Sequence, residues 1–343
     1  MNIFSKVITR VRTKRFSAFL SLAIGIFAFY LALKNVDVVQ VWETLRQANL
    51  IYVLLAIGSV ALNAFGKAAR WRILLGDKKH SLSFLRLFEI LIVGQMLNNL
   101  FPARLGDLGR AYVAGGRKTN QPSRSFVFGT VVVEKIVDLF FYLLIFAFVI
   151  ILIPDKAWMI DSIYSLVVVA VIAIITFGVV ANYPDQTTKL LKIILALFPR
   201  KIFEVVFPRI RSGLQSMKVI KNRGDLLKII LYSMVVWGTA ILNNYLAMLA
   251  LQIYLPLTAS LLVLVGLQAG ISLPSVPGWI GIFEYICVVS LDLFGIEQNI
   301  AFGYGLLLHG VVLGPAILAG VIFLWKLGGV GEFLDAKETE ITS

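Results

Sequence analysis

The chain has 343 residues, of which 59% are hydrophobic and 15% charged, and its mean hydropathy is +0.88. This composition excludes a water-soluble globular protein and predicts an integral membrane protein, with residues 1–343 forming a single transmembrane domain. The net charge of +13 does not indicate nucleic acid as a partner, because most of the 32 Lys and Arg residues flank hydrophobic runs, where they set membrane topology.

The cysteine and histidine content argues against two further kinds of site. The single cysteine, Cys287, lies in an apolar run, so the chain has no intrachain disulfide and no cysteine-based metal site. His80 and His309 are far apart in sequence and lack the spacing of metal ligands. We therefore expect neither a metal nor a cofactor.

The basic residues predict the orientation of the chain. They concentrate in four segments, 1–15, 67–86, 104–124 and 183–228. By the positive-inside rule these segments lie in the cytoplasm. We expect a multi-pass protein of the cell's inner (cytoplasmic) membrane with both termini cytoplasmic. The neutral or acidic segments lie on the other side, at residues 34–50, 154–162 and 292–299.

Six apolar runs are predicted to span the membrane. They are residues 16–33, 50–66, 126–153, 163–181, 227–251 and 300–325. The first run follows a basic start, as in a signal peptide, but it is long and lacks a convincing small-x-small cleavage site, so we interpret it as an uncleaved span. Residues 183–226 carry apolar residues at helical spacing among lysines and arginines, which predicts either cytoplasmic interfacial helices or a solubilised loop.

The second span ends in a basic and aromatic group formed by Lys67, Arg70, Trp71 and Arg72. Such residues suit anionic lipid headgroups at the cytoplasmic surface. We interpret them as anchors of the helix end, with a ligand site as the alternative.

Two further apolar segments, 84–113 and 257–294, are each interrupted by a proline. Their central parts align at a fixed offset, which matches Gly94 with Gly266, Pro102 with Pro274, Gly106 with Gly278 and Gly109 with Gly281. In both copies an apolar helix breaks at the proline and restarts through Gly-x-x-Gly, which lets the backbone turn back or pack closely. The predicted hinge residues are Pro102, Gly106, Gly109, Pro274 and Pro277.

The charge pattern predicts that both broken segments are re-entrant. A full crossing by residues 84–101 would place the basic segment 104–124 outside, so the first hairpin enters from the cytoplasmic side. The neighbours of segment 257–294 place both its ends outside. The order span, hairpin, span then occurs twice in opposite orientation, over residues 50–153 and 227–325.

We therefore expect an all-α integral membrane protein with about six spanning helices and two oppositely oriented re-entrant helical hairpins in an inverted repeat. Matched interrupted segments in two halves of a chain point to a binding site near the middle of the membrane, reached alternately from each side.

Charged residues inside a span are costly unless they are buried in the bundle or wetted, so they are candidates for function. Glu134, Lys135 and Asp138 lie in the span 126–153, with the two carboxylates four residues apart on one helix face. We expect an internal ion-pair network with the hairpin arginines, or a relay coupled to substrate, and the two can coexist.

The first hairpin carries the residues best suited to an anion. Arg104, Asp107 and Arg110 follow the break at helical spacing, and the planar arginine fork matches the oxygens of a phosphate headgroup. Alternatively, Asp107 neutralises one arginine and the other marks the cytoplasmic side. Asn98 and Asn99 either bind substrate or cap backbone groups freed by the break.

The second hairpin carries fewer charges. Ser275 is predicted to cap the restarted helix, Pro277 to occupy its first turn, and Gly278 and Gly281 to line the site. Glu284 is a lone carboxylate in an apolar helix, a setting that favours its protonated form and makes it a candidate proton carrier. Its alternative role is a structural glutamate bonded to the hairpin backbone. We interpret His309 as a helix–helix hydrogen-bonding residue.

Three runs in order carry a resemblance to a known family. NNLFPARLGDLGRAYV (98–113), VEKIVD (133–138) and SLPSVPGWIGIFEY (272–285) resemble the lysylphosphatidylglycerol synthase transmembrane family, a flippase-like domain found in multiple peptide resistance factor proteins and in stand-alone bacterial and archaeal proteins. The similarity covers nearly the whole chain. By resemblance, the motif residues are Asn99, Pro102, Arg104, Gly106, Asp107, Arg110, Glu134, Asp138, Pro274, Pro277, Gly278, Gly281 and Glu284. Lys135 replaces a more usual arginine, and Trp279 a common glycine.

The resemblance implies lipid translocation. We expect a flippase that moves an anionic or modified phospholipid, or a polyprenyl-phosphate-linked lipid, between leaflets. In that prediction Arg104 and Arg110 hold the headgroup while Glu134, Asp138 and Glu284 change protonation or pairing.

Two alternatives to a flippase stay open: a membrane enzyme acting on lipid-linked substrates, and a scaffold whose partner is a lipid-modifying synthase. The chain has no room for the aminoacyl-transferring domain of longer relatives and no Asp-x-Asp pair. We therefore expect no catalytic residue, and neither an aminoacyltransferase nor a glycosyltransferase acting alone.

Overall fold

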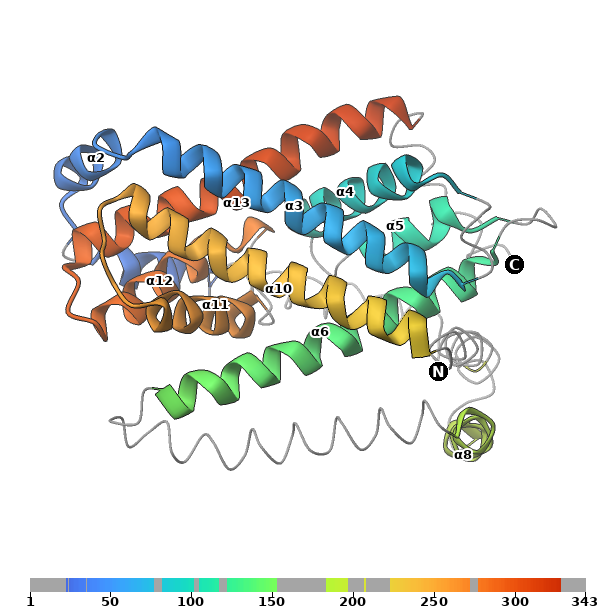
Figure 1. The fold of residues 1–343 in the computed structure, drawn as a ribbon. Helices are drawn as coiled ribbons and strands as arrows, with labels where there is room; N and C mark the ends of the chain where they lie inside the picture. The colour runs from blue at the N-terminus through green and yellow to red at the C-terminus, as the bar shows by residue number, and fades with distance from the viewer. Residues whose placement is uncertain are drawn as a thin grey trace, which may run out of the picture. The chain divides into compact units, whose positions relative to one another are not determined.

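The computed structural model describes residues 25–34, 36–76, 82–101, 105–116, 122–152, 183–196, 223–271 and 277–327, together with Ala23 and Phe207. All regular structure in these ranges is helical, which confirms the predicted all-α class (Figure 1). The helices are α2 (Val38–Arg46), α3 (Leu50–Leu74), α4 (Phe84–Leu100), α5 (Leu105–Ala114), α6 (Arg124–Leu152), α8 (Pro184–Ala196), α10 (Arg223–Ala250), α11 (Leu257–Ile271), the short 3₁₀ helix η4 (Pro277–Trp279), α12 (Ile282–Asp292) and α13 (Gln298–Lys326).

Four of the described helices, α3, α6, α10 and α13, are long and apolar enough to cross a membrane. They correspond to the predicted spans 50–66, 126–153, 227–251 and 300–325. α3 continues past the predicted end of its span to Leu74. Of the two other predicted spans, 163–181 lies outside the described residues and 16–33 lies partly outside them. Within the predicted interfacial segment 183–226, α8 is a helix with exposed Leu190 and Ile193.

The chain divides into two compact units. Unit 1 comprises Met1–Gly58, Asn99–Ala103 and Ile241–Gly314, and unit 2 comprises Ser59–Asn98, Arg104–Ala240 and Pro315–Ser343. α3, α10 and α13 contribute residues to both units. Close to the change of unit, each of these helices contains a glycine, Gly58, Gly238 or Gly314, at which an added Cβ would meet no described residue within 4 Å.

Each unit has its own apolar core, and in each core the first helix of a broken segment is central. α4 supplies Leu87, Ile90 and Leu91 to the core of unit 2, and α11 supplies Val263 and Leu267 to that of unit 1. Both helices have runs of consecutive buried residues. A helix that is apolar and buried on all sides is typical of the interior of a bundle.

In unit 2, α4 and α5 form an antiparallel helical hairpin. Asn98, late in α4, bonds to Asp107, early in α5, whereas Gly94, one turn earlier, contacts Gly106 and Arg110. A Cβ on Gly106 would overlap the carbonyl group of Gly94, so this crossing requires glycine. The predicted hinge Pro102 lies outside the described residues, as does Arg104.

In unit 1, α11 and α12 form a second antiparallel hairpin. Gly270, at the end of α11, packs on Ile282 and Ile286, and Gly266, one turn earlier, packs on Ile286 and Ser290. Between the helices, Gly278 (φ 73°) and Gly281 (φ 91°) adopt left-handed backbone conformations that glycine allows at little cost. Pro274 and Ser275 lie outside the described residues.

The two hairpins use their aligned glycines differently. Gly106 and Gly109 are buried inside α5, whereas Gly278 and Gly281 turn the chain before α12 begins at Ile282. The prediction that Pro277 occupies the first turn of the restarted α-helix is wrong, since Pro277 begins the 3₁₀ turn η4. The second hairpin therefore restarts later than the sequence alignment implies.

Candidate functional site

The short helix α5 presents one small and polar face to its neighbours. Its buried residues include Gly106, Asp107, Gly109 and Arg110, and α5 packs against α6. Because Asp107 and Arg110 are three residues apart, both side chains lie on one face of the helix. The glycines let α5 approach closely enough for these side chains to reach α4 and α6.

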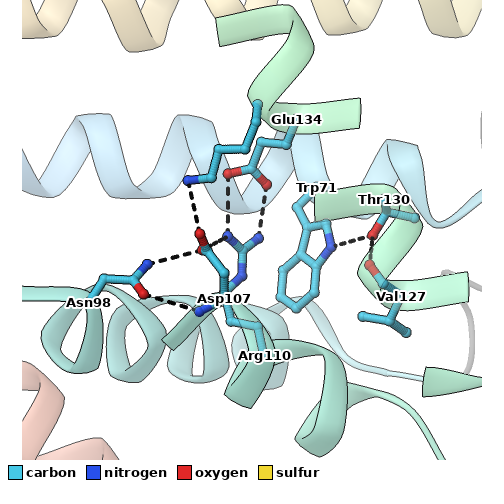
Figure 2. Close-up of polar contacts among 8 residues, drawn as sticks. Trp71, Asn98, Asp107, Arg110, Val127, Thr130 and Glu134 are labelled. Atoms are coloured by element: carbon cyan, nitrogen blue, oxygen red, sulfur yellow. Dashed lines mark hydrogen bonds and ion pairs between the residues drawn. The ribbon is translucent and has the colours of Figure 1, made fainter. Parts of the chain in front are cut away.

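Arg110 is fixed by a carboxylate and an aromatic ring (Figure 2). Its Nη1 donates to Glu134 Oε1 at 3.3 Å and its Nη2 donates to Glu134 Oε2 at 2.8 Å, with both side chains 3% exposed. The guanidinium carbon lies 4.2 Å from the centre of the Trp71 ring. The indole N–H of Trp71 donates to the Thr130 hydroxyl at 3.0 Å. A bidentate, stacked arginine of this kind is held in one geometry.

Asp107 links three helices in the same cluster. Its Oδ1 accepts a hydrogen bond from Asn98 Nδ2 at 3.0 Å, and its backbone N–H donates to Asn98 Oδ1 at 3.1 Å. Its Oδ2 lies 3.4 Å from Lys135 Nζ, whose side chain is 41% exposed. Asn98 thus caps the start of α5, as one of its two predicted roles proposed, while also orienting Asp107.

The second carboxylate of α6 meets α3. Asp138 Oδ1 lies 2.7 Å from Nη1 of Arg70, which also donates to the Ser233 hydroxyl at 2.9 Å. Arg70 and Trp71 are both fully buried, so the interpretation of these residues as surface anchors is wrong. The reason is that α3 continues beyond residue 66 and turns both side chains into unit 2.

Glu284 in unit 1 is not the lone carboxylate that the sequence suggested. Its Oε2 accepts the N–H of Gly281 at 2.7 Å, and its Oε1 lies 2.6 Å from His309 Nδ1. His309 Nε2 lies 2.7 Å from the Gly278 carbonyl oxygen, and its ring stacks on Phe283 with centroids 4.3 Å apart. His309 therefore makes the helix–helix contact that we expected.

The contacts of His309 fix the proton count of the pair. The Gly278 carbonyl can only accept, so Nε2 carries a proton, and the short Oε1–Nδ1 contact requires a second proton between its two atoms. Whether that second proton is bonded to Glu284 or to His309, the pair has no net charge. This buried pair thus holds one shared proton, which suits a proton carrier and equally a structural hydrogen bond.

The structure brings together only part of the predicted site. Asn98, Asp107, Arg110, Glu134 and Lys135 form one cluster, joined through α6 to Asp138. Gly278, Gly281 and Glu284 form another, around His309. Asn99 is half-buried and makes none of the contacts of either cluster described above.

Sequence reasoning missed the contributions of Arg70, Trp71 and Ser233 to the larger cluster. One feature of the sequence could have indicated them. Lys67 and Arg70 are three residues apart and so lie on one face if the helix of the second span continues past residue 66.

Comparison with known proteins gives a consistent family assignment. The family model described as "Lysylphosphatidylglycerol synthase TM region" matches residues 18–320. A UPF0104 membrane protein of Pyrococcus horikoshii is 25% identical over 322 residues, which cover 89% of this chain and 96% of that protein. A UPF0104 membrane protein of Methanocaldococcus jannaschii is 27% identical over 315 residues, with coverages of 87% and 92%.

A third relative, a UPF0104 membrane protein of Methanothermobacter thermautotrophicus, is 26% identical over 296 residues, which cover 82% of this chain and 86% of that protein. No solved structure matches the chain. The three motifs, the apolar helices and the extent of the family match agree, and the chain belongs to the lysylphosphatidylglycerol synthase transmembrane family.

Proposed function

We propose that this protein moves a lipid with an anionic, phosphate-containing headgroup between the two leaflets of a membrane. The observation that carries the proposal is the network of Arg110 with Glu134, Lys135 with Asp107, and Arg70 with Asp138 among apolar helices, in which the first pair is buried on both sides. Replacing a buried ion pair by apolar residues is often neutral or stabilising, so stability alone does not account for the buried pair of Arg110 and Glu134. Charges at this position in a membrane protein are functional candidates.

The Arg110–Glu134 pair supplies a simple exchange step for transport. The guanidinium fork that binds the two oxygens of Glu134 also fits two oxygens of a phosphate. It can bind either the carboxylate or the phosphate, but not both at once. In the proposed cycle, the lipid phosphate displaces Glu134 from Arg110, and Glu134 turns to the neighbouring Lys135 or takes up a proton. Departure of the lipid restores the pair.

In the proposed cycle, the second hairpin gives access to the lipid site from the other face of the membrane. We place the two hairpins as re-entrant elements that enter the membrane from opposite faces, within the inverted repeats 50–153 and 227–325. The proton shared by Glu284 and His309 is available for exchange when the second hairpin moves. In the proposed cycle, exchange of this proton couples lipid movement to proton movement.

The test is lipid translocation in proteoliposomes that contain fluorescent phosphatidylglycerol, read by quenching of the outer leaflet. The variant is Glu134→Gln, and the matched control is Glu89→Gln, because Glu89 is also buried in unit 2 and ion-paired, at 2.5 Å from Lys326 Nζ. We expect Glu134→Gln to slow translocation at least tenfold and Glu89→Gln to leave it near the wild-type rate. Thermal unfolding of each variant in detergent checks that it is folded.

The translocation assay and a product assay in detergent together separate the transporter from the two alternatives. Equal translocation by Glu134→Gln and wild type would remove this cluster from the mechanism. A scaffold for a lipid synthase predicts that neutralising the buried charges leaves function intact. An enzyme acting on a lipid-linked substrate predicts product formation in detergent micelles, where no leaflets exist.

A further inference from the structure

The guanidinium of Arg70 is fully buried and uses only one of its three nitrogens in contacts within the described residues. Nη1 faces Asp138 and Ser233, whereas Nε and Nη2 are buried without a hydrogen-bond partner among those residues. Nε and Nη2 form one edge of the planar group and present two parallel N–H donors. This edge is the fork with which arginine binds two oxygens of an anion.

Lys67 adds a charge that the cluster does not balance. The three carboxylates each pair with a cation, as Asp107 with Lys135, Glu134 with Arg110, and Asp138 with Arg70. Lys67 lies one turn before Arg70 on α3, is half-buried, and feels the charges of both carboxylates of α6 and of the cations Arg70 and Lys135. It makes no ion pair within the part of the chain that the structure describes, so one positive charge is left over.

Trp237 supplies another donor near the same place. α3 and α10 are antiparallel, because Arg70 contacts Ser233 while Asn63, two turns earlier, donates to the Val236 carbonyl at 2.6 Å. Trp237 follows Ser233 by one turn on the same face of α10, which places it at the level of Lys67. Its side chain is buried, and its indole N–H has no acceptor among the described residues.

We infer that Arg70, Lys67 and Trp237 form an anion-binding site in unit 2 that takes a phosphate group. The open groups of Arg70, Lys67 and Trp237 are donors, and buried donors of this kind normally have an acceptor. Asp138 Oδ1 also has no hydrogen-bond partner among the described residues, but it lies against Nη1 of Arg70 and not at the open edge. Water can accept their hydrogen bonds, but only an anion also balances the charge of Lys67. The site does not require the proposed function, although the assignment of the phosphate to a lipid headgroup rests on it.

The arrangement favours phosphate over a carboxylate ligand. Arg70 offers two parallel donors, and Lys67 and Trp237 offer donors from the next turns of two different helices. A phosphate has oxygens in several directions, whereas a carboxylate has two in one plane. Asp138 and Ser233 hold the other end of Arg70 and so orient its open edge. At Arg110 a phosphate must first displace the Glu134 carboxylate, whereas the edge of Arg70 is open in this structure.

The test is equilibrium binding to the purified full-length protein in detergent, with two probes, short-chain phosphatidylglycerol and inorganic phosphate. The variants are Lys67→Gln, which removes the unbalanced charge, and Trp237→Phe, which removes one donor and keeps the ring. The matched controls are Lys228→Gln and Trp42→Phe, at exposed positions. We expect Kd to rise about tenfold for Lys67→Gln and severalfold for Trp237→Phe, with the controls unchanged.

Each outcome decides one question. Tight binding of phosphatidylglycerol that both variants weaken supports the site with a lipid headgroup as its ligand. The same pattern with inorganic phosphate alone supports the site with free phosphate as its source. Wild-type affinity of both variants for both probes overturns the site. Because binding in detergent requires no leaflets, a protein that binds but does not translocate lipid would refute the proposed function and leave this site in place.

Discussion

The buried pair of Arg110 and Glu134 is stable only while both partners are present. Each side chain is 3% exposed, so loss of one partner would leave the other as an uncompensated charge in an apolar interior. Loss of both partners leaves no charge behind. The pair can therefore be tested separately for its role in stability and its role in transport.

We predict that Glu134→Leu alone lowers the free energy of unfolding by about 3–5 kcal/mol, the usual range for breaking a buried ion pair. The double variant Arg110→Met, Glu134→Leu should recover most of this loss, since it removes both charges. Translocation should stay lost in both variants. Thermal unfolding and the liposome assay measure the two effects, and a double variant that transports lipid normally would make the pair purely structural.

The sequence predicted the functional candidates that stand out from their immediate neighbours along the chain. The two carboxylates of α6 could be identified because charges are rare in an apolar run. The partner of Glu134 was also predictable as an arginine of the first hairpin, and it is Arg110. The partner of Asp138 was not, because Arg70 lies beyond the point where the hydropathy of its span ends. Hydropathy reports which side chains tolerate lipid, and it does not show that a helix continues with buried charges.

At the scale of elements, the two hairpins reach similar shapes by different local means. In each predicted broken segment the structure has two helices, α4 and α5 in the first and α11 and α12 in the second, while the predicted break points Pro102 and Pro274 lie outside the described residues. The sequence did not predict where the second helix restarts. Gly106 allows two helices to cross closely, whereas Gly278 allows a left-handed backbone turn. A sequence alignment cannot distinguish these two roles of glycine.

The different roles of these glycines predict different tolerance to substitution. Gly106→Ala should cost about 3 kcal/mol, because its Cβ would overlap the Gly94 carbonyl group in a packed crossing. Gly278→Asn should cost only about 1 kcal/mol, since asparagine tolerates positive φ and the nearest atom to an added Cβ there is 3.6 Å away. Thermal unfolding of the two variants measures the loss of stability in each. An equal cost at both positions would contradict the assigned roles.

At the scale of the whole molecule, the proposed cycle requires that the hairpins enter the membrane from opposite faces. The described helices give lengths and internal packing for each unit, and charge bias gives the expected sides. The proposed arrangement predicts that Ser123, just before α6, lies on the cytoplasmic side and that Tyr254, between α10 and α11, lies on the outer side.

This topology is checked by cysteine labelling in a Cys287→Ser background. We expect Ser123→Cys to react with a membrane-impermeant maleimide only in inverted vesicles and Tyr254→Cys only in intact cells, because Ser123 and Tyr254 are both exposed. Wild-type Cys287, which is fully buried, should react in neither preparation and serves as the control. Reaction of both positions from one side would refute the inverted arrangement.

The glycines close to the points where α3, α10 and α13 pass from one unit to the other have a mechanical consequence. Gly58, Gly238 and Gly314 each cost about 1 kcal/mol relative to alanine within a helix, yet no described neighbour within 4 Å requires them to be small. We predict that replacing all three by alanine raises the unfolding temperature and slows lipid translocation. A stabilised variant with unchanged turnover would refute this. If the prediction holds, each of these helices bends at its glycine, and the rate of lipid translocation is limited by the free energy of that bending.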